Sequence, residues 1–405
     1  MNILYINHYA GGPALGMEFR PYHLAREWVR AGHRVRVVGA TFSHLRHVQP
    51  AAGDACIDGI DHRWLPTPSY QGNGLGRVWN IACFLARLRL QAGQLLRACR
   101  PDLVIASSTY PMDIWVARHI ARRAGAQLVH EVHDLWPLSP IELSGMSPRH
   151  PFIRLCQAAE DAACRDADRV VSILPRVHDH LAAHGLDLRR LVIVPNGIDP
   201  ADWLAPAVPL RADLAALLAR LRAAGRTVVG YTGSMGLPNA LDVLLDAAAM
   251  LRDLPLDIVL VGDGHERARL VQRIDRERLG QVHWLPPVPK DQIPTLLRAL
   301  DIAYLGWQRT PIYRFGIAPN KLMDYMAAGC AVLHSVEAGN DPVAETGCGV
   351  SVAAESPQAV ADGLRRMAAL PAAERARLGQ LGQAHVMRHH TWPVLAARFL
   401  DGLQP

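Results

Sequence analysis

Two successive series of short apolar runs constrain the fold of this chain most strongly, because segments with helical spacing separate the runs. We expect the first series to form strands at residues 2–7, 34–39, 103–106, 127–131, 169–173 and 191–194. We expect the second series at residues 227–231, 257–261, 282–285, 302–305 and 331–334. Strands that alternate with helices form parallel sheets covered by helices on both faces. The sequence therefore predicts an α/β protein with two doubly wound domains.

A turn-rich stretch, Pro195–Pro200, separates the two series. We expect an N-terminal domain at residues 1–197, completed by a closing helix within residues 391–405, and a C-terminal domain at residues 198–390. A length of 405 residues agrees with two large domains. Because open parallel sheets bind ligands at the carboxyl ends of their strands, we expect the site in a cleft between the domains.

Composition excludes several classes of protein. Half of the residues are apolar and a fifth are charged, which excludes wholesale disorder. No apolar run approaches the roughly 18 residues of a membrane-spanning helix, and the strand-like start lacks the basic region of a signal peptide. The seven cysteines are odd in number and include no Cys-x-x-Cys pair. They favour a cytoplasmic protein without a disulfide framework or zinc site.

All of the net charge of +6 belongs to residues 1–195, and no acid lies between Asp61 and Asp102. Within that gap apolar residues recur at helical spacing beside Arg77, Trp79, Arg87 and Arg89. We interpret this segment as a basic amphipathic helix on an anionic membrane surface. A helix packed on the core with a solvated basic face is the alternative. Nucleic acid is not an expected partner, because no nucleic-acid-binding motif accompanies the charge.

Two strand ends of the first series carry candidate site residues. A glycine-containing loop that includes Gly16 follows the first strand, where backbone amides can approach an anion. His133 and Asp134 follow the strand at residues 127–131, and His133 can donate to a substrate hydroxyl or accept a proton. A histidine held in the core is the alternative. Trp136 either shapes a sugar or lipid pocket or merely packs.

The second series carries glycine turns at two strand ends. Gly233, Ser234 and Gly236 follow the strand at residues 227–231 and suit close approach of a phosphate. Gly262 and Gly264 follow the strand at residues 257–261 and suit a flat base lying against the backbone.

A helix start at Pro319-Asn320 places Lys321 in a first turn, where a cation opposes the helix dipole. A bound anion would explain that arrangement. Asp324, one turn later, could accept hydrogen bonds from ribose hydroxyls. A solvated surface lysine is the alternative.

Together these residues resemble a retaining glycosyltransferase of family 4, closest to the WbuB-like subgroup of surface-polysaccharide enzymes. The resemblance spans the whole chain and is strongest at residues 195–199, 319–329 and 16–22. His133-Asp134 is similar to the family's His-Asp pair, and Thr391-Trp392 resembles the start of its closing helix. The resemblance implies the GT-B fold, with two Rossmann-like domains facing a cleft and a C-terminal helix that returns to the first domain.

The chain departs from the family pattern at two places. The family's Glu-x7-Glu pair aligns with Gly316 and Asp324, so only the second acid remains, as Asp. Both usual pyrophosphate cations are missing near Ser234 and Asn239. Because departure of a nucleoside diphosphate needs its charge stabilised, we expect Lys321 and Asn320 to replace them, assisted by Arg314 or Arg309.

The resemblance implies transfer of a sugar from a UDP-sugar, an N-acetylhexosamine or deoxy relative, to a polyprenyl-diphosphate-linked glycan in O-antigen, capsule or exopolysaccharide biosynthesis. The implied catalytic residues are His133, Asp134, Lys321 and Asp324. The implied donor contacts are Gly16, Gly233, Ser234, Gly236, Gly262, Gly264, Val288, Arg314, Gly316, Asn320, Lys321 and Asp324. The implied acceptor or membrane contacts are Glu18, Arg20, Arg77, Trp79, Arg87, Arg89 and Trp136.

No cofactor or metal is expected, and the protein is expected in the cytoplasm, at the inner membrane surface. Two alternatives stay open. A UDP-N-acetylglucosamine 2-epimerase of the same fold would convert a UDP-sugar without an acceptor. A non-catalytic nucleotide-sugar-binding partner would bind UDP without turnover, consistent with the missing first Glu.

Overall fold

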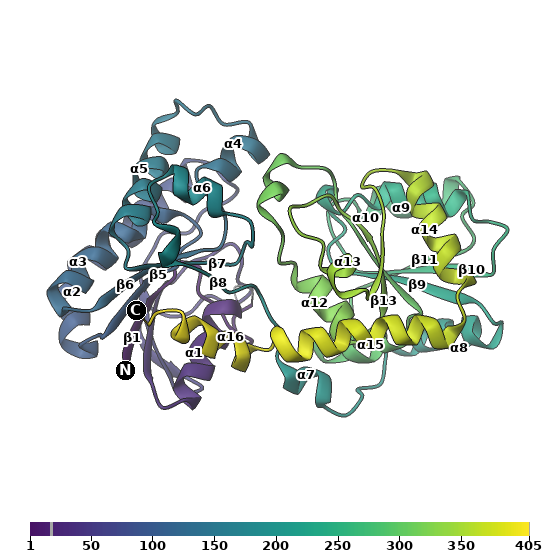
Figure 1. Cartoon of the computed structure of the whole chain (residues 1–405), viewed down its shortest axis with the longest axis horizontal. Coiled ribbons are helices and arrows are strands. Elements are labelled where there is room, and N and C mark those ends of the chain that lie inside the picture. Colours follow the sequence, from purple (N-terminus) through teal and green to yellow (C-terminus); the bar gives the residue numbers. More distant parts are fainter. Residues whose placement is uncertain (17–18, 405) are drawn as a thin grey trace. The chain divides into compact units, whose positions relative to one another are not determined.

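The computed structural model describes residues 1–16 and 19–404 and divides into two compact units. Unit 1 contains residues 1–196 and the C-terminal segment that begins at Trp392, and unit 2 contains residues 197–391. Each unit has one sheet with helices on both faces, and Figure 1 shows its elements in sequence colours. The predicted pair of doubly wound α/β domains is confirmed.

The sheet of unit 1 has the strand order β3-β4-β2-β1-β5-β6-β7-β8 and is parallel except for the antiparallel edge strand β3. Its strands are β1 (Asn2–Ile6), β2 (Arg34–Ala40), β3 (Gly53–Ile57), β4 (Ile60–Leu65), β5 (Leu103–Ala106), β6 (Gln127–Val132), β7 (Arg169–Ser172) and β8 (Leu191–Ile193). Sequence analysis missed β3 and β4, because β3 is mostly exposed and β4 alternates buried and polar residues instead of forming an apolar run.

The helices of unit 1 are α1 (Phe19–Arg30), α2 (Leu75–Cys99), α3 (Ile114–Ala124), α4 (Leu138–Ser144), α5 (Pro151–Asp166), α6 (His178–Ala183) and α16 (Trp392–Asp401). Helices α1 and α16 pack against each other (Figure 1). The indole of Trp28 donates to the Ala396 carbonyl at 3.0 Å, and its ring meets Phe399 at a centroid distance of 5.1 Å. The chain's last helix therefore completes the apolar core of unit 1.

The sheet of unit 2 is wholly parallel, with the strand order β11-β10-β9-β12-β13-β14. Its strands are β9 (Thr227–Thr232), β10 (Leu256–Val261), β11 (Val282–Leu285), β12 (Ile302–Gly306), β13 (Ala331–Ser335) and β14 (Gly349–Ser351). Strands buried on both faces read as continuous apolar runs, which explains why the sequence located five of them. Strand β14 is short and only partly buried, and it gave no such run.

The helices of unit 2 are α7 (Pro200–Leu204), α8 (Ala212–Ala223), α9 (Leu241–Ala249), α10 (Arg267–Arg276), α11 (Ile293–Arg298), α12 (Asn320–Ala327), α13 (Pro342–Thr346), α14 (Pro357–Ala369) and α15 (Ala372–His389). Short 3-10 turns connect several of them, including η3 (Leu237–Asn239), η4 (Lys290–Gln292) and η5 (Pro311–Phe315). In the described ranges, no helix combines the length and apolarity needed to cross a membrane.

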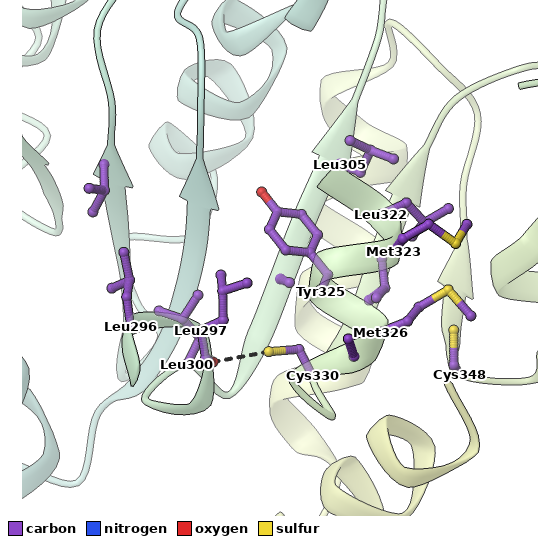
Figure 2. Packing of buried hydrophobic residues seen from close by; sticks show 14 of the residues in the cluster. Leu296, Leu297, Leu300, Leu305, Leu322, Met323, Tyr325, Met326, Cys330 and Cys348 are labelled. Carbon is purple, nitrogen blue, oxygen red and sulfur yellow. Dashed lines mark hydrogen bonds between the residues drawn. The ribbon is translucent and has the colours of Figure 1, made fainter. Parts of the chain in front are cut away.

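Helix α12 is held by a packed apolar cluster, drawn in Figure 2. Leu322, Met323 and Met326 are buried on this helix, and the Cys330 thiol that follows it donates to the Leu297 carbonyl at 3.0 Å. The buried Tyr325 hydroxyl accepts from the Thr232 amide at 3.0 Å, which joins α12 to the end of β9. These contacts position the start of α12, with Lys321 in its first turn and Asp324 one turn later.

Candidate functional site

A buried carboxylate, Glu131 on β6, organises the carboxyl ends of the strands in unit 1. Its oxygens accept hydrogen bonds from the Tyr5 hydroxyl at 2.6 Å and the Ser107 hydroxyl at 2.6 Å. Arg20 donates to Glu131 at 2.9 Å and also reaches the carbonyls of Val194 and Pro195. Burial alone raises the pKa of Glu131, but Arg20, His133 and the hydrogen bonds together hold that pKa well below its usual range.

This network determines the orientation of His133. The Nε2 atom of His133 lies 2.8 Å from Ser107 Oγ and 3.2 Å from Glu131 Oε2. Because Ser107 gives its only proton to the carboxylate, its oxygen accepts from the Nε2–H of His133. Nδ1 is then the imidazole nitrogen left for a ligand. His133 is therefore held by the side chains of Ser107 and Glu131, and not by backbone contacts in the core.

The structure corrects one prediction in unit 1 and gives two other predicted residues a local structural role. Arg20 is 5% exposed and paired with Glu131, so the predicted contact of Arg20 with acceptor or membrane is wrong. Asp134 Oδ1 accepts from the Leu135 amide at 2.9 Å and the Ser139 hydroxyl at 2.5 Å, so this oxygen holds the turn before α4. The backbone of Gly16 is hydrogen-bonded to that of Gly12 and closes a tight loop. Its φ of 106° lies in a region that favours glycine, so the loop conformation accounts for a glycine at this position. Glu18 lies outside the described residues.

The predicted basic helix exists as α2, but two of its arginines turn toward the protein. Arg77 donates to the Tyr9 hydroxyl at 3.1 Å and lies over the ring of Trp136 at 5.6 Å, and Arg87 donates to the Pro66 carbonyl. Arg89 is exposed. Three large apolar residues of α2 are also strongly exposed: Leu75 (87%), Trp79 (64%) and Leu90 (82%).

An open, mainly apolar groove of about 550 Å³ lies between the start of α2 and the segment α4–α5 in unit 1. Trp136 forms part of its wall and meets Phe152 edge to face, at 5.9 Å between ring centroids. Arg77 and His150 supply its basic groups, and Asp134 supplies an acid. The groove therefore combines a long apolar surface with a cation at one side.

In unit 2, Lys321 is a buried cation held by neutral partners. Its Nζ donates to the Tyr231 hydroxyl at 2.8 Å and the Asn239 carbonyl oxygen at 3.1 Å, and it lies 4.2 Å from the centroid of the Tyr231 ring. In residues 1–16 and 19–404 no carboxylate lies within ion-pairing distance of it. Burial lowers the pKa of Lys321 to about 7. The alternative of a solvated surface lysine is therefore wrong.

The glycines of the two preceding loops allow Lys321 and the backbone to pack closely. Gly233 has a φ of 129°, and a Cβ there would lie 2.9 Å from Lys321 Cε. A Cβ on Gly262 would lie 1.9 Å from the Gly233 carbonyl oxygen, and one on Gly264 would lie 2.4 Å from the Met235 carbonyl oxygen. Contact between the loops thus accounts for Gly262 and Gly264, whereas the sequence analysis attributed them to a bound base.

The remaining predicted donor contacts lie in different settings. Asp324 lies one turn after Lys321 on α12. Burial raises the pKa of Asp324 to about 7. Among the described residues, its carboxylate accepts no hydrogen bond. Ser234 and Asn320 are exposed. Gly316 ends η5 at a φ of 89°, Gly236 is buried near His265, and Val288 packs on the core.

The predicted assisting arginines are engaged elsewhere. Arg314 donates to the Pro311 carbonyl at 2.7 Å and stacks on the ring of Phe315. Arg309 forms an ion pair with Glu337 at 2.8 Å. Lys321 and Asp324 therefore remain the two ionisable residues that helix α12 itself contributes to the predicted site.

Sequence analysis missed the partners that orient these groups, namely Tyr5, Ser107, Glu131, Tyr231 and Asn239. A usable signal existed for Glu131, since a carboxylate inside an apolar strand must have buried partners. Tyr231 and Asn239 carried no such signal, because their contact with Lys321 joins residues 90 and 82 positions apart.

The chain matches two glycosyltransferase domain families in succession. Residues 16–197 match the Glycosyl transferase 4-like domain, and residues 226–369 match Glycosyl transferases group 1. With the two-unit α/β fold described above, these matches identify a glycosyltransferase of the GT-B type.

Individual relatives agree with this class. WcaI of Escherichia coli K12, named as a glycosyl transferase of colanic acid biosynthesis, is 26% identical over 367 residues, which are 85% of this chain and 87% of WcaI. Sucrose-phosphate synthase of Thermosynechococcus elongatus has a similar structure, with a TM-score of 0.72, 17% identity and coverage of 98% and 97% of the two chains. HepE of Anabaena, solved with UDP and glucose, has a TM-score of 0.67, 18% identity and coverage of 100% and 99%. At these identities the two solved structures support the fold.

We expect Glu131→Gln to destabilise unit 1 by about 3–5 kcal/mol, because it leaves the Arg20 guanidinium buried without a counter-ion. Urea unfolding of the variant and the wild type measures this difference. The surface ion pair of Asp54, which is exposed, and Arg63 provides a control, since Asp54→Asn should change stability by less than about 1 kcal/mol. Equal effects of the two substitutions would contradict the central role of Glu131.

The same variant should alter the acid response. The pKa of Glu131 is lower in the folded than in the unfolded protein, so its contribution is present above the unfolded pKa of about 4.3 and is lost as pH falls below that value. Wild-type stability should therefore decline below about pH 4.3 more steeply than that of Glu131→Gln.

Proposed function

We propose that this chain is a retaining glycosyltransferase that moves a sugar, an N-acetylhexosamine or a deoxy relative, from a UDP-sugar to a polyprenyl-diphosphate-linked glycan. The observation that carries the proposal is Lys321, a buried ammonium with neutral partners at the start of a helix. The name of WcaI supports a role in surface-polysaccharide synthesis, and the UDP in HepE supports a UDP-sugar donor. The WbuB-like subgroup remains part of this proposal.

Departure of UDP from the sugar places negative charge on the diphosphate, and the first turn of α12 offers what that charge needs. The Lys321 ammonium has a proton available to an anion, and the free amides at the helix start add their partial positive charge. The exposed Ser234 hydroxyl adjoins the Gly233 turn beneath which Lys321 passes. We assign Lys321, Asn320 and Ser234 to the diphosphate and Asp324 to ribose hydroxyls.

His133 is assigned to a sugar hydroxyl near the reacting carbon. Its Nε2–H is held by Ser107 and Glu131, so neutral His133 presents Nδ1 as a hydrogen-bond acceptor. The chain's own residues then supply leaving-group stabilisation and orientation, and we propose that transfer proceeds without a metal cofactor.

The acceptor lipid is assigned to the groove between α2 and the segment α4–α5. An isoprenoid chain suits the apolar walls around Trp136 and Phe152, and the Arg77 guanidinium suits a diphosphate at one side. The outward Leu75, Trp79 and Leu90 continue the apolar surface along α2, which supports contact with the membrane that holds such a lipid.

The decisive experiment is mass spectrometry of the protein mixed with UDP- and GDP-sugars and polyprenyl-diphosphate-linked sugars. We expect a hexosamine-sized mass gain on the lipid with a UDP-sugar. We also expect His133→Ala to lower turnover by roughly 10²-fold with UDP affinity nearly unchanged, because its contact is to the sugar. Isomerised UDP-sugar without a lipid product would contradict the proposal, as would UDP binding without any turnover.

Lys321→Met should weaken UDP binding at pH 6.5 by about 2 kcal/mol, or about 30-fold, because the diphosphate loses a charge-assisted hydrogen bond. With a pKa of about 7 in the free protein, Lys321 must take up a proton when UDP binds at higher pH. Wild-type affinity should therefore fall from pH 7 to pH 9. Calorimetry in buffers of different ionisation enthalpy measures both effects.

The control for this measurement is Arg365→Met, which removes an exposed cation of unit 2 paired with Asp362. It should leave UDP affinity and proton uptake unchanged. Equal UDP affinity in Lys321→Met and the wild type would exclude Lys321 from the diphosphate site.

The double variant Trp79→Ser, Leu90→Ser should reduce binding to vesicles that contain anionic lipid by at least tenfold, because it removes two strongly exposed apolar side chains of α2. Cosedimentation measures this change. Leu204→Ser removes a leucine of unit 2 that is 79% exposed and should have no effect. Vesicle binding that survives the double variant would assign these α2 residues no membrane role.

A further inference from the structure

A cluster of histidine and carboxylate side chains lies on unit 1 at the junction of α5 and α6. Glu160 comes from α5, His180 from α6, and His184 follows the last turn of α6. One ligand atom from each of these residues lies within 4.8 Å of the other two. Glu160 is 4% exposed, while the side chains of His180 and His184 are 12% and 26% exposed, so the cluster opens to solvent on the histidine side. The proposed transfer reaction uses none of these residues.

Both imidazoles turn the same atom toward one carboxylate. His180 Nε2 lies 2.8 Å from Glu160 Oε1, and His184 Nε2 lies 3.9 Å from Glu160 Oε2. The two rings are 4.6 Å apart between centroids. Two imidazole nitrogens and a carboxylate oxygen that converge in this way form a ligand set suited to a borderline transition-metal ion.

A second carboxylate orients His184. Asp161 Oδ1 lies 2.9 Å from His184 Nδ1, the nitrogen on the far side of the ring from Glu160. A hydrogen bond from Nδ1–H to a carboxylate fixes the tautomer in which Nε2 carries the free lone pair. Metal-binding histidines commonly have such a partner.

The cluster also has an excess of negative charge. Glu160 and Asp161 are adjacent, and one amide nitrogen, Nε2 of Gln157, lies 2.9 Å from an oxygen of each. Within the described part of the chain, the ion-pair partners of these two carboxylates are histidines, with no arginine or lysine among them. If both histidines are neutral, a divalent cation would neutralise the pair.

We propose that Glu160, His180 and His184 bind one divalent transition-metal ion of the Zn²⁺ type, with Asp161 as the residue that positions His184. Ligand bonds of about 2.0–2.1 Å in a tetrahedral centre place the ligand atoms about 3.3–3.4 Å apart. The Glu160 contacts at 2.8 Å and 3.9 Å lie on either side of this spacing, and all three ligand atoms lie within 4.8 Å of one another, so side-chain movements can bring them to it. Three protein ligands leave the fourth position to water on the exposed side.

Metal binding at this place would join α6 to α5. It would displace the proton shared by His180 and Glu160 into solvent, so the ion should bind more weakly as pH falls. The ion would thereby anchor the connection between β7 and β8 to the body of unit 1, which is a structural role and adds no step to the transfer reaction.

The test is a Zn²⁺ titration of the full-length protein without an affinity tag, in competition with a chromophoric chelator. We expect one strong site in the wild type and at least tenfold weaker binding in His180→Ala and His184→Ala. We expect Zn²⁺ to raise the melting temperature of the wild type but not of these two variants. Bound Co²⁺ should give visible absorption typical of four or five ligands in the wild type alone.

Two histidine variants serve as matched controls. His178→Ala removes an exposed histidine from α6, and His389→Ala breaks the pair that His385 and His389 form on α15, 4.9 Å apart between ring centroids. Both should keep the strong site. The proposal is overturned if the wild type binds no Zn²⁺, if His180→Ala and His184→Ala bind it as tightly as His178→Ala, or if only His389→Ala loses it. Circular dichroism of each metal-free variant checks its fold, and Glu160→Gln replaces any variant that fails.

Discussion

The buried ion pair of Arg20 and Glu131 is the interaction on which the order of unit 1 depends. Removing two charges from water is costly, and the cost is offset only if every polar atom finds a partner. Here the carboxylate accepts from Tyr5 on β1, Ser107 after β5 and Arg20 on α1, while Arg20 also holds the carbonyls of Val194 and Pro195. The ion pair thus connects β6 to four other segments, and the orientation of His133 follows from it.

Unit 2 also removes a charged group from water, but this group is a cation and its partners among the described residues are neutral. Lys321 is buried against Tyr231 and Asn239, whose neutral oxygens accept its protons but do not cancel its charge. The close packing of the loops at Gly233, Gly262 and Gly264 makes that burial possible. The first turn of α12 is consequently electropositive and poorly solvated, which is the environment in which an anion gains most from binding.

The proposed roles therefore divide between rigid frameworks and exposed surfaces. His133 and Lys321 are both held by hydrogen bonds from other elements, so they need little reorganisation when a ligand arrives. Helix α2 differs, because Arg77 and Arg87 bind the protein while large apolar residues such as Trp79 and Leu90 face outward. A surface of this kind supports membrane contact through apolar burial more than through charge. The histidine cluster at α5 and α6 belongs to neither group and has the chemistry of a metal site.

The sequence by itself determined the alternation of strands and helices, the eleven strands with apolar runs, and the placement of His133 and Lys321 at a strand end and a helix start. These are local features, since apolar periodicity and helix-start residues act over a few positions. The edge hairpin β3–β4, the turn of Arg20 and Arg77 toward the protein, and the convergence of Glu160 on His180 and His184 were decided only by the tertiary structure. Each depends on contacts between segments distant in the chain, and burial there sets both the direction of a side chain and the pKa of groups such as Lys321 and Asp324.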